Sequence, residues 1–327
     1  MNGSIDTVEP VESILSFRGV TKWFGRRVAV EDVDLDLLEG RTLGIVGESG
    51  SGKTTCVRLA LALEAPTSGT ITFRGRAYPR TRRRLADIRR HIGFVFQDPY
   101  DSLDARMMIG DIVSQPLRIH GVRKAEAWRR AEQVLEAVGL PDVQLDNYPA
   151  SFSGGGRQRI AIARALSLDP EVLLCDEPTA SLDVSVQAQI VNLLLELKAS
   201  RQLSVIFVSH DLDLIRRIAD DVMVMYQGRV VETGDAETVH ARPRHPYTVA
   251  LLSAVPGGHP RQRKLAGQPP PATIREGVDR IGCLFAPRCP RVQKTCRGTV
   301  PPLRVNQDEV RVACFFPHEN QEVADAR

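Results

Sequence analysis

The sequence predicts an α/β protein built on a mainly parallel sheet. Two stretches, residues 171–176 (EVLLCD) and 204–209 (SVIFVS), are almost wholly apolar, as strands covered on both faces are. Helical patterns adjoin them, over residues 153–168 and 184–199. Buried strands that alternate with helices are typical of a parallel sheet with helices on its faces.

The N-terminal part of the chain follows a different pattern. Residues 14–43 form short runs with partial apolar/polar alternation, which predicts a half-exposed antiparallel sheet. TLGIVG at 42–47 then predicts a buried strand, and residues 53–65 predict a helix. A second strand at 91–97 (HIGFVFQ) is followed by a helical region over 98–149.

The C-terminal third changes character after one more pair of strands. Residues 222–226 and 229–233 flank a hairpin-like turn at Gln227-Gly228. Residues 241–271 are rich in Pro, Gly, Arg and His, and we expect a domain boundary at 240–256. The rest of the chain is proline-rich, shows little periodicity and holds four cysteines, so we expect it to need a staple.

Composition excludes several classes of protein. The formal net charge of +3 does not argue for nucleic acid, and no stretch approaches the ~20 apolar residues that span a bilayer. The polar, acidic first residues are unlike a secretory signal, so we expect a cytosolic protein with reduced thiols. Cys56 and Cys175 lie in apolar patterns and are predicted core residues. The basic run at 80–91 predicts a solvated helix face rather than a contact with phosphate or lipid headgroups.

The most specific motif is GESGSGKT, which fits G-x-x-x-x-G-K-[ST] after a predicted strand and before a predicted helix. Its glycines let backbone N–H groups turn toward phosphates, and the helix adds its positive end. Lys53 supplies a charge and the Thr54 hydroxyl reaches Mg²⁺. A simple Gly-rich turn is the weaker alternative, so we expect ATP binding and hydrolysis. The predicted ATP contacts in and next to this loop are Gly47, Glu48, Ser49, Gly50, Ser51, Gly52, Lys53, Thr54 and Thr55.

Acidic and imidazole side chains stand at the ends of the two apolar strands. Asp176 ends one strand and can hold Mg²⁺, directly or through water, and Glu177 is placed to polarise an attacking water. His210 follows the other strand, where it can contact a γ-phosphate. An acidic pair alone can equally be a capped turn, and a lone histidine is usually structural, so both depend on the phosphate loop for their interpretation.

The stretch SFSGGGRQRIAIARAL resembles the signature motif of ATP-binding cassette (ABC) transporter ATPases, and the resemblance covers residues 14–234. It implies the P-loop NTPase fold of that family: a RecA-like parallel sheet, an antiparallel β subdomain and a helical subdomain at about 98–157. The nucleotide-binding domain is then residues 12–240, and a small Cys-rich extension occupies 241–327. The resemblance also assigns roles: Glu177, His210 and Gln97 to catalysis; Thr54, Gln97 and Asp176 to Mg²⁺; Phe24 to the adenine; and Asp183 to the D-loop.

In this family two cassettes pack head to tail, so the signature serves the ATP of the partner. The resemblance implies that Ser153 and the backbone of Gly154, Gly155 and Gly156 cap the partner's γ-phosphate. Gly156 departs from the family, which usually has glutamine there. Because the backbone donors remain, we expect reduced or altered function of the partner's site rather than its loss.

The segments HPYT at 245–248, GCLFAPRCP and VACFFP resemble the oligopeptide/dipeptide (and nickel) importer branch. That branch implies a bacterial ATPase subunit that powers peptide uptake, closing with ATP and opening after hydrolysis. The implied partners are a second ABC ATPase subunit, expected to be a different chain, two transmembrane permease subunits and an extracytoplasmic substrate-binding protein, with no nucleic acid. The implied place is the cytoplasmic face of the inner membrane, with residues 98–149 against a permease.

Four cysteines mark the extension: Cys283, Cys289, Cys296 and Cys314. In a cytosolic, proline-rich stretch such thiols suggest metal thiolate ligation. The resemblance implies a [4Fe–4S] cluster with a stapling role, while zinc, free thiols or disulfides remain alternatives.

Two other functions stay open. ABC proteins that act on ribosomes or in DNA repair usually carry two cassettes or a long coiled coil, and neither pattern is present. An ATP-binding regulatory partner remains an alternative for the composite site because of Gly156. This sequence does not identify the transported substrate.

Overall fold

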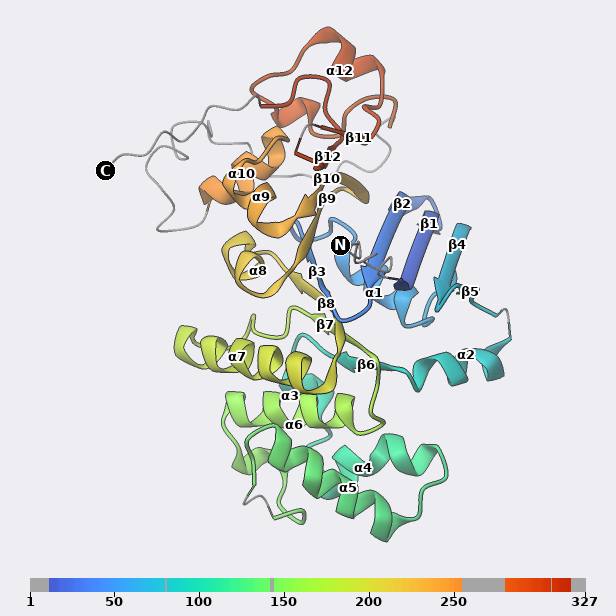
Figure 1. Cartoon of the computed structure of the whole chain (residues 1–327), viewed down its shortest axis with the longest axis vertical. Coiled ribbons are helices and arrows are strands. Elements are labelled where there is room, and N and C mark those ends of the chain that lie inside the picture. The colour runs from blue at the N-terminus through green and yellow to red at the C-terminus, as the bar shows by residue number, and fades with distance from the viewer. Residues whose placement is uncertain (1–11, 80, 142–143, 255–279, 307, 319–327) are drawn as a thin grey trace, which may run out of the picture.

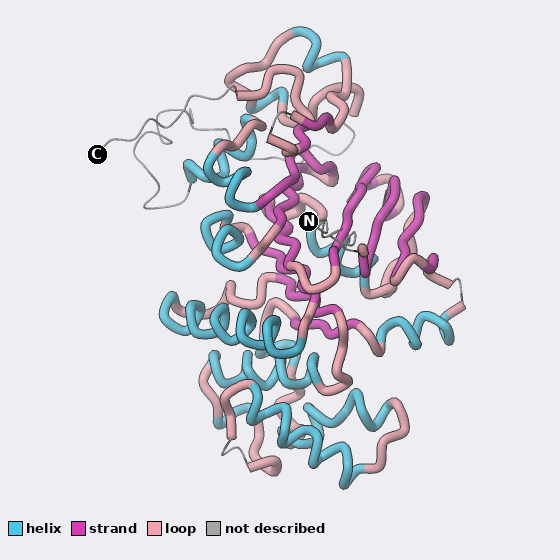
Figure 2. The backbone as a smooth tube through the Cα atoms, viewed as in Figure 1, coloured by secondary structure: helices cyan, strands magenta, loops and turns pink. Residues whose placement is uncertain are grey.

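A computed structural model describes residues 12–79, 81–141, 144–254, 280–306 and 308–318. Its backbone is organised around an eight-stranded sheet in the order β11-β12-β10-β9-β3-β8-β7-β6, which runs through the middle of the molecule (Figures 1 and 2). The strands of this sheet are β3 (Thr42–Val46), β6 (Ile92–Val95), β7 (Val172–Asp176), β8 (Ser204–Ser209), β9 (Asp221–Tyr226), β10 (Arg229–Asp235), β11 (Arg304–Val305) and β12 (Arg311–Val312).

Five adjacent strands of this sheet, from β9 through β3, β8 and β7 to β6, are mutually parallel. Every residue of β3, β7 and β8 is buried, which explains their nearly continuous apolar sequences. The predicted parallel α/β sheet is therefore confirmed. Since the strands are parallel, the residues that follow β3, β6, β7 and β8 all emerge at one edge, where ligands bind in open sheets of this kind.

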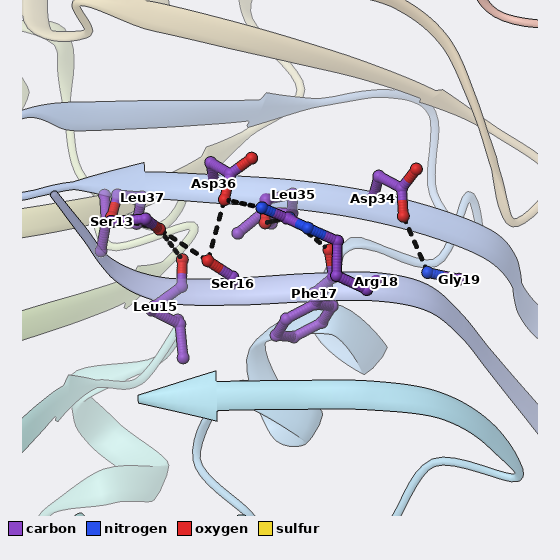
Figure 3. A network of polar contacts seen from close by, with 10 residues as sticks. All are labelled: Ser13, Leu15, Ser16, Phe17, Arg18, Gly19, Asp34, Leu35, Asp36 and Leu37. Carbon is purple, nitrogen blue, oxygen red and sulfur yellow. Dashed lines mark hydrogen bonds and ion pairs between the residues drawn. The ribbon is translucent and has the colours of Figure 1, made fainter. Parts of the chain in front are cut away.

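A second, antiparallel sheet stands beside the first in the order β2-β1-β4-β5 (Figure 1). The predicted antiparallel pair over 14–43 is β1 (Ser13–Phe24) with β2 (Arg27–Leu38); β4 (Ser68–Phe73) and β5 (Arg76–Ala77) were not predicted. Figure 3 shows the polar contacts that hold β1 against β2. Ser16 Oγ and Arg18 Nη2 donate to the same oxygen of Asp36, at 2.8 and 2.7 Å, and the Gly19 N–H donates to Asp34.

The helices surround the large sheet, and a helical layer lies at one end of the molecule (Figure 1). That layer holds α4, α5 and α6. The helical pattern predicted over 98–149 is confirmed by α3, α4 and α5, which lie in that range. The bounds are α1 (Lys53–Ala60), α2 (Arg82–Arg89), α3 (Pro99–Ser102), α4 (Ile109–Ile119), α5 (Lys124–Ala137), η1 (Pro149–Ser151), α6 (Gly154–Leu166), α7 (Val184–Arg201), α8 (Leu212–Ile218), α9 (Ala236–Ala241), α10 (Pro246–Ala254), η2 (Ala286–Arg288) and α12 (Lys294–Gly298). Within the described ranges, no helix is both long and apolar enough to cross a bilayer.

The basic run predicted to be a solvated helix face forms α2. One of its arginines is not simply solvated, because Arg89 donates to the carbonyls of Leu61 and Ala62 at 3.1 and 2.6 Å. These are carbonyls just beyond the end of α1, so Arg89 satisfies acceptors that the helix leaves free. The same side chain therefore links α2 to the helix that follows the phosphate loop.

The described residues after 240 (241–254, 280–306 and 308–318) pack on the main core rather than standing apart. Tyr247 and Phe285 are buried to 0 and 2% exposure, and their rings lie 4.6 and 5.4 Å from the ring of Tyr226 on β9. β12 adds to the main sheet by pairing antiparallel with β10. The carboxylate of buried Glu232 accepts the backbone N–H groups of residues 244 and 245 at 2.7 and 2.9 Å. The extension is thus held by sheet pairing, aromatic packing and buried hydrogen bonds.

Some predictions concern residues outside the described ranges. The polar N-terminus up to residue 11, most of the predicted linker at 255–271, and the last residues from 319 belong there. The boundary predicted at 240–256 stays a prediction.

Candidate functional site

The phosphate-loop motif occupies the turn between β3 and α1, as its sequence context predicts. Gly50 and Gly52 have φ values of 77° and 107°, a region that favours glycine. A Cβ at Gly52 would lie 2.6 Å from the Ala29 carbonyl oxygen, so the loop also needs glycine for close approach. The Gly228 N–H donates to the Ser51 carbonyl at 2.8 Å, so the β9–β10 turn supports the loop from outside.

Lys53 lies at the start of α1 with its amine folded over the loop. Its Nζ donates to the carbonyl oxygens of Gly47 and Glu48, at 2.7 and 3.1 Å. Lys53 is 5% exposed, and burial lowers its pKa while Glu177, with Nζ 3.6 Å from Oε1, acts in the opposite direction. A cation held by two neutral carbonyls in a buried loop is poised to bind an anion.

The carboxylate of Glu177 contacts two further predicted functional side chains besides Lys53, those of Gln97 and His210. Gln97 Nε2 donates to its Oε2 at 3.3 Å, and His210 Nδ1 lies 3.6 Å from the same oxygen. The three residues follow β6, β7 and β8, so parallel pairing of those strands brings them together. Glu177 has φ 47° and its N–H donates to the Val208 carbonyl at 3.1 Å, which fixes the turn that carries it.

Asp176, one residue earlier, has the features of a cation ligand. It is 5% exposed, and its Oδ1 is buried without a hydrogen-bond partner. Burial raises its pKa, and a hydrogen bond with the Thr54 side chain acts in the opposite direction. A buried carboxylate oxygen with no partner, beside a hydroxyl, fits the oxygen ligands that Mg²⁺ takes.

The signature residues form the N-terminus of α6, where Ser153 is the N-cap. Its Oγ accepts the Gly156 N–H at 3.3 Å. Asp183 caps α7 in the same way, accepting the Val186 N–H at 3.0 Å. A Cβ at Gly155 would lie 2.6 Å from Val186, so the signature and D-loop helices touch where they begin. In the described part of the chain, neither Ser153 nor Asp183 makes a hydrogen bond or ion pair with the Glu177 side chain, whose partners are Gln97, Lys53 and His210.

Phe24, predicted to stack on adenine, lies at the end of β1. Its side chain is 42% exposed, and Lys22 Nζ lies 4.9 Å from the ring centroid. A partly exposed aromatic ring can accept a stacked base. The stacking role remains a prediction.

Two contacts to the phosphate loop were missed by the sequence analysis, and both come from the extension. Arg288 donates two hydrogen bonds to the Glu48 carboxylate, each at 2.8 Å, and the Tyr247 hydroxyl accepts the Glu48 N–H at 2.8 Å. About 200 residues or more separate each pair, so no local pattern could have revealed them.

The prediction of a [4Fe–4S] cluster at Cys283, Cys289, Cys296 and Cys314 is wrong. The four thiols are free and line one hollow of about 10 Å³, room for about one water. Across the described residues, no group of three or more His, Cys, Asp or Glu side chains is arranged to hold a metal ion. Burial raises the pKa of Cys314 to about 11. The zinc alternative meets the same objection. Cys56 and Cys175 are buried core residues, as predicted.

A glycine-rich cradle at a helix N-terminus, a buried lysine and two acidic residues at the end of β7, two strands along the sheet from β3, define a P-loop nucleoside-triphosphate site. Residues 30–180 match the family model described as ABC transporter, and residues 231–296 match that of the oligopeptide/dipeptide transporter C-terminal region. The chain belongs to the ABC transporter family of ATPases, whose members couple ATP hydrolysis to transport.

Similar proteins include one of Brucella ovis named a peptide import ATP-binding protein, 45% identical over 92% of this chain and 96% of its own length. A Brucella abortus protein with the same description is 45% identical over 88% of this chain and 86% of its length. Among solved structures, Clostridium perfringens CbiO1, part of the ABC transporter complex CbiONQ, has a TM-score of 0.65 at 29% identity, over 70% and 91% of the two chains. The ATP-binding cassette MJ0796, a dimer bound to ADP and phosphate, has a TM-score of 0.61 at 30% identity, over 68% and 98%.

Proposed function

We propose that this chain is the ATP-hydrolysing subunit of a bacterial peptide importer. One observation carries the enzymatic half of the proposal: Gln97, His210 and Lys53 converge on the single carboxylate of Glu177 beside the phosphate loop. The peptide half is supported by the named function of the relatives and by the match of residues 231–296 to the oligopeptide/dipeptide transporter region.

In the proposed reaction, Glu177 accepts a proton from the water that attacks the γ-phosphate. Its carboxylate already accepts a hydrogen bond from Gln97, which leaves it oriented by a neutral donor. His210 lies 3.6 Å from the same oxygen on an adjacent strand end, where it can contact the γ-phosphate. Lys53 exchanges its two carbonyl partners for phosphate oxygens and stabilises their charge.

Asp176, Thr54 and Gln97 would hold Mg²⁺; the Thr54 side chain is hydrogen-bonded to Asp176. The cation neutralises phosphate charge when it is bound. The buried, partnerless Oδ1 of Asp176 supports this assignment, because an ionised oxygen without a partner is costly in the interior.

The proposed working unit is a head-to-tail pair of cassettes. Ser153 and the three glycines that follow it would cap the γ-phosphate of ATP held by the partner, with Asp183 at the same interface. The dimeric state of the MJ0796 structure supports this arrangement. We expect the partner to be a different chain. Two permease subunits in the membrane and an extracytoplasmic binding protein complete the proposed complex, and this chain sits at the cytoplasmic face as a peripheral subunit.

Peptide uptake tests the cargo. Cells that carry the assembled transporter are given a labelled dipeptide or a labelled pentapeptide, and uptake is compared between the natural chain and Lys53→Ala. Exposed Lys294→Ala, on α12, is the matched control. We expect Lys53→Ala to abolish uptake of at least one peptide and the control to preserve it. ATP turnover with no uptake of either peptide would show that the cargo is another solute.

A further inference from the structure

The phosphate loop is tied to the C-terminal extension through its second residue, Glu48. The guanidinium of Arg288 donates Nη1 to one carboxylate oxygen and Nη2 to the other, each at 2.8 Å. The Arg288 side chain is 10% exposed and that of Glu48 is 33% exposed. A two-pronged pair of this kind fixes direction as well as distance, and partial burial protects it from screening.

The backbone of the same loop residue is held by a second group from the extension. The Glu48 N–H donates to the hydroxyl of Tyr247, at 2.8 Å. Tyr247 is fully buried, and its ring packs against Tyr226 and Phe285, with centroids 4.6 and 5.5 Å away. Because those rings are part of the core, the hydroxyl cannot follow the loop if the loop moves.

The position of Glu48 also bears on Lys53. The Glu48 N–H that Tyr247 holds belongs to the same peptide group as the Gly47 carbonyl, which accepts from Lys53 Nζ at 2.7 Å. The carbonyl of Glu48, whose side chain Arg288 holds, accepts from the same amine at 3.1 Å. The extension therefore reaches the phosphate-binding cation through one intervening residue. Substitutions in the extension can therefore shift the position of the Lys53 amine although they do not contact the nucleotide.

Charge gives the contact a further consequence. Glu48 places a carboxylate in a loop that receives a polyanion, and an unpaired carboxylate there would repel phosphates. Arg288 neutralises it and also lies 5.8 and 5.6 Å from the ring centroids of Tyr226 and Phe285. If the salt bridge only attached the extension, ATP affinity would not depend on whether residue 48 carries a negative charge.

We propose that Arg288 and Tyr247 are positioning residues for ATP binding, which act through Glu48 to preset the phosphate loop. The extension is then part of the nucleotide site of its own chain. By linkage, ATP stabilises the contact between loop and extension as much as that contact favours ATP. This inference depends on ATP binding and not on the cargo, so a failed peptide-uptake experiment leaves it unaffected.

The test measures binding of mant-ATP with Mg²⁺ to the full chain. The variants are Arg288→Gln, Glu48→Gln and the two combined, with exposed Arg297→Gln on α12 as the matched control. We expect Arg288→Gln to raise Kd about tenfold, the scale of one partly buried charged hydrogen-bond pair. The combined variant should recover about threefold of that loss, because it removes the uncompensated carboxylate. The control should stay within about twofold.

The partial recovery of ATP affinity in the combined variant is the decisive result. If the combined variant binds as weakly as Arg288→Gln or more weakly, the pair is only a structural fastening and the proposal fails. If Arg288→Gln does not fold, Arg288→Lys keeps the charge but loses the two-pronged geometry, and its Kd should lie between those of the natural chain and the combined variant. An unchanged Kd in Arg288→Lys would also overturn the proposal.

Tyr247→Phe gives an independent measurement, since it removes only the hydroxyl oxygen. Hydrogen exchange at the Glu48 N–H should become at least about tenfold faster without nucleotide, and slow again when Mg²⁺ and ATP are added. Unchanged exchange in the nucleotide-free variant would contradict the assigned role of Tyr247.

Discussion

Gln97 Nε2 donates a hydrogen bond to Glu177 Oε2 at 3.3 Å, across the ends of two neighbouring parallel strands. This contact joins the second residue after β6, the strand that leads into the helical layer, to the proposed general base. A movement of α3 to α6 can therefore reach the carboxylate through one side chain. Such a link is what a transporter ATPase needs if a membrane subunit grips the helical layer.

Gln97→Ala removes this donor. We expect ATP turnover to fall by more than about tenfold, because the general base loses the group that orients it. The Kd of mant-ATP should change less than threefold, since the phosphate loop is untouched. Exposed Gln133→Ala on α5 is the control. Equal losses in binding and turnover would argue that Gln97 acts on nucleotide binding instead.

Gly156 offers a gain-of-function test of the partner's site. In a background where Glu177→Gln silences this chain's own site, the remaining turnover belongs to the partner's loop. We expect Gly156→Gln to raise that turnover up to about fivefold, the equivalent of the ~1 kcal/mol that a glycine costs in a helix. A Cβ there would lie 3.1 Å from the Phe152 ring, which must shift by a few tenths of an ångström. Gly298 lies in open space on α12, so Gly298→Gln controls for helix propensity alone. If the Gly156→Gln variant turned over ATP no faster than the Gly298→Gln control, the prediction would be contradicted.

Phe285→Ala tests whether the extension shares the main core. The side chain is 2% exposed and packs against Tyr226, Tyr247 and His245. The free energy of unfolding in urea should fall by about 3–5 kcal/mol, and by less than about 1.5 kcal/mol for Phe285→Leu. A loss under 1 kcal/mol for Phe285→Ala would show that the extension is only loosely attached.

His245 predicts a specific pH dependence of stability. It is fully buried, and burial lowers its pKa to about 3, below the ordinary 6.5. The unfolded chain then binds a proton between pH 6.5 and 3 that the folded chain does not, so stability falls as pH falls below 6.5. Between pH 7.5 and 5.5 the natural chain should lose about 1.4 kcal/mol more than His245→Asn.

Asparagine suits this comparison because its oxygen can accept the Tyr247 N–H, as His245 Nδ1 does at 3.0 Å. Unfolding in urea at the two pH values gives the difference. Parallel pH profiles for the natural chain and the variant would mean that His245 is not held neutral in the folded protein.

The elements near the nucleotide were predictable because each carries a local signal. The apolar runs that end at Asp176 and Ser209 and the glycines before Lys53 are contiguous patterns that fix strand, loop and helix. β4 was missed, since only its pairing with β1 distinguishes it from a loop. Which strands pair with one another depends on residues far apart in the chain, and local sequence does not reveal it.

The extension was harder to predict for the same reason. Its sequence lacks periodicity, and its four cysteines suggested a metal staple, whereas the structure holds it by β12 on β10 and by Phe285 in the core. The partnership of Glu48 with Arg288 depends on residues 240 positions apart. Spacing within a motif gives no sign of such a contact.

ATP turnover by the assembled transporter with Glu177→Gln tests the central claim most directly. The substitution keeps size and most packing but removes the carboxylate on which Gln97, His210 and Lys53 converge. We predict that turnover falls at least about tenfold while the Kd of mant-ATP is unchanged. Undiminished turnover would contradict the account, because this chain's own site would not be the one that hydrolyses ATP.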